Sequence, residues 1–318
     1  MPNWTTVTKF LLLGFSDIWQ LQILQFVIFL AVYLAALVGN LLVITAVATD
    51  HHLHSPMYYF LANLSFLDLG SISVIVPKSM ANSLLNNRII SYAGCVSQVF
   101  FFFLFSTAGF AILTIMAYDR YVAICKPLHY GIIMNTRALI QMAACAWVVG
   151  AINSAMHTGN TFSLPFCHSN IINQFFCEIP QLLKLSCSDT NHRELAAIVF
   201  SMCSGLGCFV FIIVSYVQIF TTVWRIPSEQ GRQKAFSTCI PHLIVVSLFL
   251  STGIIAYLKP ISDSPSPLDL LVAVLYCVVP PLMNPVIYSM RNREIQAALK
   301  QLLHRLILSK TNLPFFVS

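Results

Sequence analysis

Charged side chains are scarce in this sequence: only 9% of its 318 residues are Asp, Glu, Lys or Arg, whereas 58% are hydrophobic. Soluble domains carry about 25% charged residues, so this composition excludes an ordinary soluble protein. The 11 acids are too sparse for paired-carboxylate catalysis, and the sequence lacks a phosphate-binding glycine loop, a nucleophile elbow and a His-rich metal motif. We therefore expect neither an enzyme nor a bound cofactor.

Long apolar runs are what the sequence has in abundance. A run of about 20 apolar residues is long enough to cross a membrane as a helix. Seven such runs lie near residues 23–49, 57–79, 97–119, 138–159, 196–224, 237–258 and 268–290. They predict an all-α membrane protein, a seven-transmembrane helix bundle forming one domain. That domain covers residues 1–318, with a leader at 1–22, the bundle at 23–290 and a short amphipathic helix and tail at 291–318.

The distribution of Lys and Arg predicts the orientation. Segments on one side of the expected membrane carry an excess of seven positive charges, whereas those on the other side are neutral. The positive-inside rule then places the amino terminus outside the cell and the carboxyl terminus in the cytosol. The basic excess suits an anionic lipid leaflet and gives no reason to invoke nucleic acid. The sequon Asn3-Trp4-Thr5 lies on the outer side, so Asn3 is a predicted glycosylation site.

An adjacent acid and base end the third apolar run. Charges are costly inside a bilayer, so Asp119 and Arg120 are expected at the membrane edge of the bundle. They belong to the triplet Asp119-Arg120-Tyr121, which is followed by Val-Ala-Ile-Cys and by Lys-Pro-Leu-His-Tyr, ending at Tyr130. This stretch resembles the cytosolic end of the third helix in rhodopsin-like G-protein-coupled receptors, and specifically the olfactory receptor family. Residues 53–60, Leu-His-Ser-Pro-Met-Tyr-Tyr-Phe, resemble a second olfactory motif, with Tyr59 where the family usually has Phe.

The resemblance implies a plasma-membrane receptor that binds a small, mainly apolar volatile odorant. It also implies a heterotrimeric G-protein partner, the stimulatory olfactory type, whose activation raises cyclic AMP. Within the receptor class, the alternative is a sensor of an endogenous apolar metabolite outside the olfactory epithelium. A membrane transporter is the rival from another class, and it would show inverted repeats, broken helices or several charges at mid-membrane. This chain has one acid there, Asp68.

Three polar residues interrupt otherwise apolar helices: Asn40, Asp68 and Asn284. Each is expected to face the interior of the bundle, and together they indicate one shared site. The resemblance implies a water- and sodium-linked network that rearranges on activation, whereas the simpler alternative is that these groups only join helices. The resemblance likewise assigns coupling to the G protein to Asp119, Arg120, Tyr121, Tyr216, Lys234, Asn284, Pro285 and Tyr288.

The outer half of the third helix sets the expected ligand chemistry. It contains no acid that would pair with an amine, and the seventh run contains no Lys for a retinal Schiff base. An apolar cavity with a few hydroxyl groups remains, as is usual for small-molecule pockets between helices. Helical spacing groups Phe102, Phe103, Ser106 and Thr107 on one face, with Phe110 one turn further in. The resemblance adds Phe200, Ser204, Ile254 and Tyr257.

Two departures from the family fall in the sixth run. Leu250 stands at a pocket position where the family commonly has Tyr, so a hydroxyl is missing from the expected pocket floor. Ile240-Pro241 places a proline inside a helix, which removes a hydrogen bond and favours a kink. We expect these changes to alter the ligand set or the gating rather than the fold.

Four of the ten cysteines lie on the predicted outer side, where disulfides persist: Cys95, Cys167, Cys177 and Cys187. Four cysteines allow three pairings, and their spacing alone does not choose among them. The resemblance implies Cys95–Cys177, which ties the third helix to the second outer loop, and Cys167–Cys187 within that loop. Family members often carry a His, proposed as a metal ligand, where this chain has Gln174, so we predict no metal.

Overall fold

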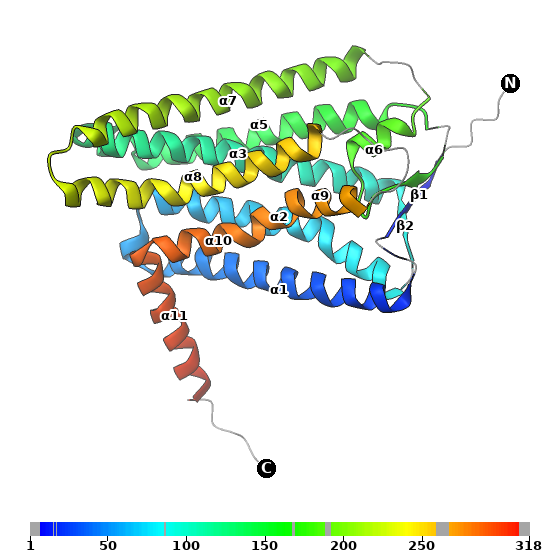
Figure 1. Ribbon diagram of the computed structural model, residues 1–318, viewed down its shortest axis with the longest axis horizontal. Helices are drawn as coiled ribbons and strands as arrows, with labels where there is room; N and C mark the ends of the chain where they lie inside the picture. Colours follow the sequence, from blue (N-terminus) through cyan, green and yellow to red (C-terminus); the bar gives the residue numbers. More distant parts are fainter. Residues whose placement is uncertain are drawn as a thin grey trace.

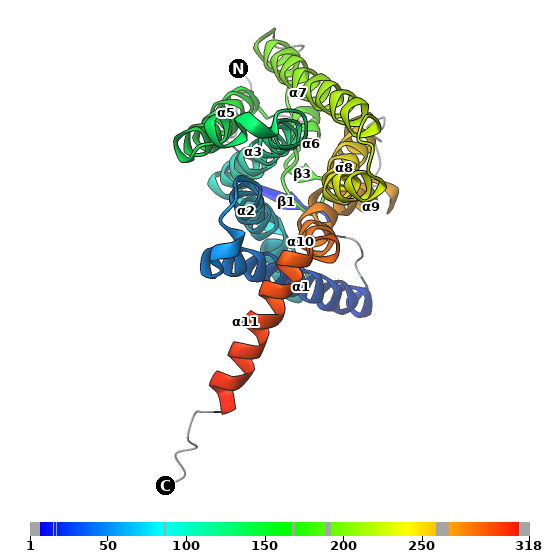
Figure 2. The same cartoon turned by 90° about the vertical axis from the view of Figure 1, so that its left-hand side faces the viewer.

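The computed structural model describes residues 7–14, 16, 18–85, 87–166, 169–187, 192–258 and 267–311. Six long helices within these ranges are apolar enough to cross a membrane: α1 (Trp19–Thr49), α2 (Pro56–Leu85), α3 (Tyr92–Cys125), α5 (Thr136–Phe162), α7 (His192–Trp224) and α8 (Glu229–Leu258). A bent pair, α9 (Pro267–Cys277) and α10 (Val279–Arg291), makes up a further span. Figures 1 and 2 show these helices packed side by side as one bundle.

The seventh predicted span is broken rather than continuous. α9 ends at Cys277, α10 begins at Val279, and the two helices meet at an angle of 42°. Pro280 and Pro281 follow the break directly. Because proline has no N–H, two hydrogen bonds that would continue α9 into α10 are lost, and the chain bends there.

Helix α3 lies at the centre of the bundle and packs against α2, α5, α7 and α8. Its first turn is capped by Ser91, whose side chain accepts a hydrogen bond of 3.1 Å from the backbone N–H of Gly94. Against α5 the helix approaches Gly150 so closely that an added Cβ would lie 2.9 Å from the carbonyl oxygen of Leu104. A small residue is needed there because membrane helices gain stability from close backbone packing.

A small sheet covers one end of the bundle, where Figure 1 also places α6 (Ile179–Lys184) and α9. Strand β1 (Lys9–Leu12) lies between β2 (Ile89–Ser91), with which it pairs antiparallel, and β3 (Ile171–Ile172), with which it pairs parallel. Phe10 and Leu12 of β1 are fully buried in a cluster with Cys95 and Cys177. Strand β1 is therefore part of the structure that closes this end.

The opposite end carries short turns and the last helix. The turns are η1 (His51–Leu53), η2 (Pro127–His129) and α4 (Tyr130–Ile133), and α11 (Arg293–Thr311) leaves the bundle after α10 (Figure 2). The hydroxyl of Tyr58, at the start of α2, donates a 2.6 Å hydrogen bond to Glu294 and also pairs with Asn292. These bonds fix the first turn of α11 against the bundle, where the sequence predicts an amphipathic helix.

Candidate ligand cavity and signalling end

Asp68 and Asn284, from α2 and α10, form a direct polar pair inside the bundle. Asn284 Nδ2 donates to Asp68 Oδ2 at 2.9 Å, and only 8% and 4% of the two residues are exposed. Asn40 of α1 joins them indirectly: its Nδ2 donates to the carbonyl oxygens of Ala36 and Pro281, each at 2.9 Å. The predicted three-residue network is thus brought together across α1, α2 and α10, with Asn40 acting through the backbone of α10.

A cavity of about 30 Å³ lies beside this pair. Its lining includes Asp68, Phe102, Ser106, Phe249, Tyr276 and Asn284. A volume of about 10–15 Å³ is needed for one water molecule, so the cavity has room for about two. It joins two predicted ligand residues of α3, Phe102 and Ser106, to the Asp68–Asn284 pair. A larger molecule fits only when the surrounding aromatic side chains move.

Neither Phe110 nor Leu250 lines this cavity, but Phe110 contacts a lining residue. The Phe110 ring stacks on Phe249, a lining residue, with centroids 5.4 Å apart and an angle of 4° between the rings. Leu250 is partly buried and packs on the same hydrophobic core. Phe110 therefore supports the position of the Phe249 ring in the cavity lining.

Phe103 and Thr107 face another set of polar groups, toward α5 and α7. Thr107 Oγ1 accepts a 3.1 Å hydrogen bond from Asn153 Nδ2, and Ser201 Oγ donates to Asn153 Oδ1 at 2.6 Å. His157 bonds to Ser201 at 2.7 Å, and its ring lies 5.3 Å from that of Phe103. This chain of hydrogen bonds joins α3, α5 and α7.

Three of the four ligand residues expected from the fifth and sixth spans are exposed and do not line the cavity in this conformation. Phe200 and Ile254 are 52% and 53% exposed, and Ser204 is also exposed. The side chain of Tyr257 lies outside the described part of the structure. Their contact with a ligand stays a prediction.

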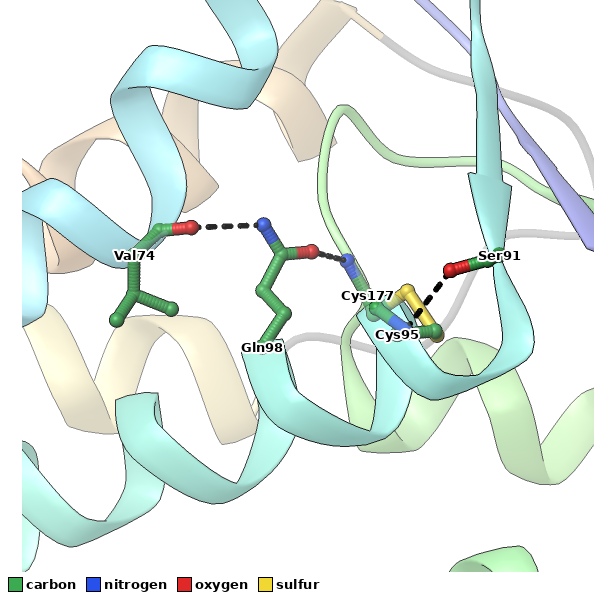
Figure 3. The surroundings of a disulfide bond; sticks show 6 residues. Val74, Ser91, Cys95, Gln98 and Cys177 are labelled. Carbon is green, nitrogen blue, oxygen red and sulfur yellow. Dashed lines mark hydrogen bonds between the residues drawn. A yellow bond between two sulfur atoms is a disulfide. The ribbon is translucent and has the colours of Figure 1, made fainter.

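The loop after α5 is held against α3 by a disulfide and a buried glutamine (Figure 3). Cys95 of α3 is bonded to Cys177, as the family resemblance implies. Gln98, one turn along α3, accepts a 2.8 Å hydrogen bond from the Cys177 N–H and donates one of 3.0 Å to the Val74 carbonyl of α2. Cys187 is also disulfide-bonded. Cys167 lies outside the described residues, as does Asn3, so the Cys167–Cys187 pairing and the glycosylation site stay predictions.

At the opposite end of α3, Asp119 and Arg120 are both buried and have separate partners. Asp119 accepts a 2.7 Å hydrogen bond from the Tyr130 hydroxyl, and the Arg120 guanidinium contacts the Met57 sulfur. The Lys126 ammonium lies over the Tyr121 ring, and its Nζ is 5.5 Å from the ring centroid. The motif therefore packs against α2 and the turns that follow α3.

The Tyr216 hydroxyl is bonded to a buried histidine, His242. His242 Nε2 lies 2.9 Å from the carbonyl oxygen of Leu113, and its Nδ1 lies 2.8 Å from the Tyr216 hydroxyl. A carbonyl only accepts, so Nε2 carries the proton and Tyr216 donates to Nδ1. This bridge joins α3, α7 and α8.

The remaining residues of the predicted coupling set lie on α8 and α10. Lys234 is exposed near the start of α8, and Tyr288 is buried in the core. The Pro285 ring packs so closely on α1 that a Cβ added to Gly39 would lie 3.0 Å from Pro285 Cγ. The coupling set thus spans α3, α7, α8 and α10.

A family model described as "Olfactory receptor" matches residues 29–306. The chain belongs to the olfactory receptor family. Among curated human proteins, Olfactory receptor 14A16 is 52% identical over 303 residues, covering 95% of this chain and 98% of the relative. Olfactory receptor 14C36 is 52% identical over 310 residues (98% and 99%), and Olfactory receptor 14J1 is 50% identical over 314 (99% and 96%).

Membership of this family confirms the recognition, the class of fold and the general function expected from the motifs. The olfactory receptor is a multi-pass membrane protein and a G-protein-coupled receptor with seven spans, and its family consists of receptors rather than enzymes. The bent α9–α10 pair is accordingly one span, the seventh. The family also implies an odorant ligand and coupling to a G protein.

Several residues of the site were missed by sequence reasoning. Gln98, Asn153, His157 and His242 are polar residues within apolar runs, so the signal that singled out Asp68 also applies to them. Glu178 and Tyr276, which are joined by a 2.6 Å hydrogen bond, gave no such signal. An acid in a loop and a tyrosine near a helix end are unremarkable until the fold places them in contact.

Proposed function

We propose that this olfactory receptor binds a small, mainly apolar volatile molecule and activates the stimulatory olfactory G protein, raising cyclic AMP. The observation that carries the proposal is the shared cavity, in which Phe102 and Ser106 line the same space as Asp68 and Asn284. A ligand that displaces the aromatic side chains there acts directly on the buried polar pair, and that pair lies between α2 and α10.

The ligand chemistry follows from the lining. Most of the described lining residues are apolar or aromatic, and the one acid among them, Asp68, is bonded to Asn284. Ser106 supplies a hydroxyl for one oxygen of the ligand, as in an alcohol, aldehyde, ketone or ester. Two further groups complete the proposed ligand set: Phe103, Thr107 and Phe110 on helical spacing, and Phe200, Ser204, Leu250, Ile254 and Tyr257 on the family resemblance.

For the predicted coupling set around Arg120, we infer that the Tyr216–His242 bridge belongs to the resting state. Tyr216 is held by His242 at 2.8 Å, so release of this bond frees its hydroxyl to approach Arg120. Lys234 lines the face that opens, and Tyr121, Pro285 and Tyr288 move with the helices around it. The proposed orientation, with a cytosolic carboxyl terminus, puts this basic face toward the G protein at the plasma membrane.

The proposal is tested by measuring cyclic AMP in cells that express this chain with the olfactory G protein, against a chemically broad odorant panel. Arg120→Ala is expected to abolish every response at unchanged surface expression, because it removes the charge of the coupling motif. Arg137→Ala is the matched control, since Arg137 is an exposed arginine at the start of α5. Silence of the unmodified receptor at proven surface expression would favour an endogenous ligand instead.

Ser106→Ala is expected to raise the half-maximal concentration of an oxygen-bearing agonist about fivefold, since a neutral hydrogen bond contributes about 0.5–1.5 kcal/mol. A purely hydrocarbon agonist, where one is found, is expected to be unaffected. Ser251→Ala serves as the control, because Ser251 is exposed and its hydroxyl bonds to the Leu248 carbonyl of its own helix. Equal potency of Ser106→Ala and the parent receptor would remove Ser106 from the ligand set.

A further inference from the structure

Three aromatic rings meet at one side of the cavity lining. Phe102 and Tyr276 line the cavity, and Phe176 of the loop after α5 packs on both. The three ring centroids are 5.9, 6.0 and 6.2 Å apart. The disulfide residue Cys177 follows Phe176 directly, so this side faces the end of the bundle covered by the small sheet.

A hydrogen bond joins the loop to the seventh span at this place. The Tyr276 hydroxyl donates to Glu178 Oε1 at 2.6 Å. Within the described ranges, Tyr276, Gln174 and Asp269 act on the Glu178 carboxylate, which in turn acts on the Cys277 thiol, and none of these groups is a cation. Burial raises the pKa of Glu178 and the nearby Asp269 raises it further, while the bonds from Tyr276 and Gln174 oppose the rise. A bond to an ionised acceptor is roughly twice as strong as a neutral one.

The two sides of this bond differ in how firmly they are held. Glu178 follows Cys177, which is fixed to α3 by the disulfide and by Gln98. Tyr276 is the penultimate residue of α9, directly before the bend that separates α9 from α10. Opening this side of the cavity therefore requires Tyr276 or α9 to move, while the loop stays in place.

We propose that Glu178 and Tyr276 form a latch that closes the outer side of the ligand cavity. In this arrangement the Tyr276 ring bounds the space for the ligand and selects ligands by length, and Glu178 is a positioning residue that acts through the Tyr276 hydroxyl. That the latch selects ligands rests on the proposed function. That the latch closes the cavity does not, because it concerns the receptor without a ligand. With room for about two water molecules, that cavity admits a larger molecule only after the latch opens.

Cys277 offers a probe of the latch that needs no agonist. It is a free cysteine, 2% exposed, that lines the cavity next to Tyr276. Methyl methanethiosulfonate is applied to the outside of intact cells, and the rate of modification is read at the Cys277 peptide of surface receptor by mass spectrometry. Tyr276→Phe keeps the ring and removes the bond, so modification is expected to become about tenfold faster. Tyr33→Phe is the matched control: its hydroxyl bonds to Ser73, in an exposed position.

Variants of Glu178, the acceptor of this hydrogen bond, distinguish a latch from a general loss of packing around Cys277. Glu178→Ala and Glu178→Gln both remove a negative charge that acts on the Cys277 thiol, so these two variants are compared with each other. Glu178→Gln keeps an acceptor oxygen for Tyr276 and is expected to be labelled more slowly than Glu178→Ala. The double variant Glu178→Ala, Tyr276→Phe is expected to be no faster than Glu178→Ala, because both changes remove the same bond. A Tyr276→Phe rate within twofold of the parent, or effects that multiply in the double variant, would overturn the latch. Because this labelling uses neither agonist nor G protein, its failure is distinct from failure of the proposed function.

Discussion

Replacing Cys95 with Ser is expected to lower the amount of receptor at the cell surface about tenfold. The disulfide closes a loop of 82 residues between the first turn of α3 and Cys177. Both sulfurs are buried in the cluster that includes Phe10 and Ile172. Removing a disulfide from a small secreted domain costs about 2–5 kcal/mol, a large part of the total stability of about 5–15 kcal/mol. The measurement is surface staining of a tagged receptor relative to its total amount.

Cys145→Ser is the matched control, because Cys145 is free and exposed on α5. Cys177→Ser and the double variant are expected to equal Cys95→Ser, since each removes the same bond. A Cys95→Ser receptor that reaches the surface at the level of the parent would show that Gln98 and the small sheet hold the loop without the disulfide.

The helices of this receptor were largely predictable because apolar run length is a local property. The run at 23–49, for example, became α1 at Trp19–Thr49. The break at Val278 was less evident, since Pro280 and Pro281 occur in a run long enough to span as one helix. The sheet gave no local signal. Strand β1 has four residues and is stabilised by partners near residues 90 and 171, which only the complete fold brings together.

The candidate site was predictable where it contains polar or charged side chains, because such side chains are costly inside a membrane. Asp68 and Asn284 were found because a bilayer penalises polar groups that lack a partner, and they do pair. The sequence does not reveal how far each helix is rotated, which places Ser106 at the cavity and Thr107 against Asn153. Glu178 and Tyr276 are 98 positions apart, so their contact depends on the placement of a whole loop.

Exchanging the members of the Asp68–Asn284 pair is expected to give the clearest evidence that the pair is a switch. Asn284→Asp places a second carboxylate against Asp68, where 8% and 4% of the two residues are exposed. Burying like charges without hydrogen-bonded partners is costly, so the agonist response is expected to fall more than about tenfold. Asp68→Asn leaves two amides that still bond to each other, and is expected to weaken the response less.

The double variant Asp68→Asn, Asn284→Asp restores one acid and one amide with their positions reversed. Its response, measured as cyclic AMP at matched surface expression, is expected to exceed that of Asn284→Asp alone, because the buried carboxylate again accepts from an amide. A pair that only joined helices would recover surface expression in the double variant without recovering the response. A double variant that recovers neither would mean that the acid is needed specifically on α2, where the cavity beside Ser106 surrounds it.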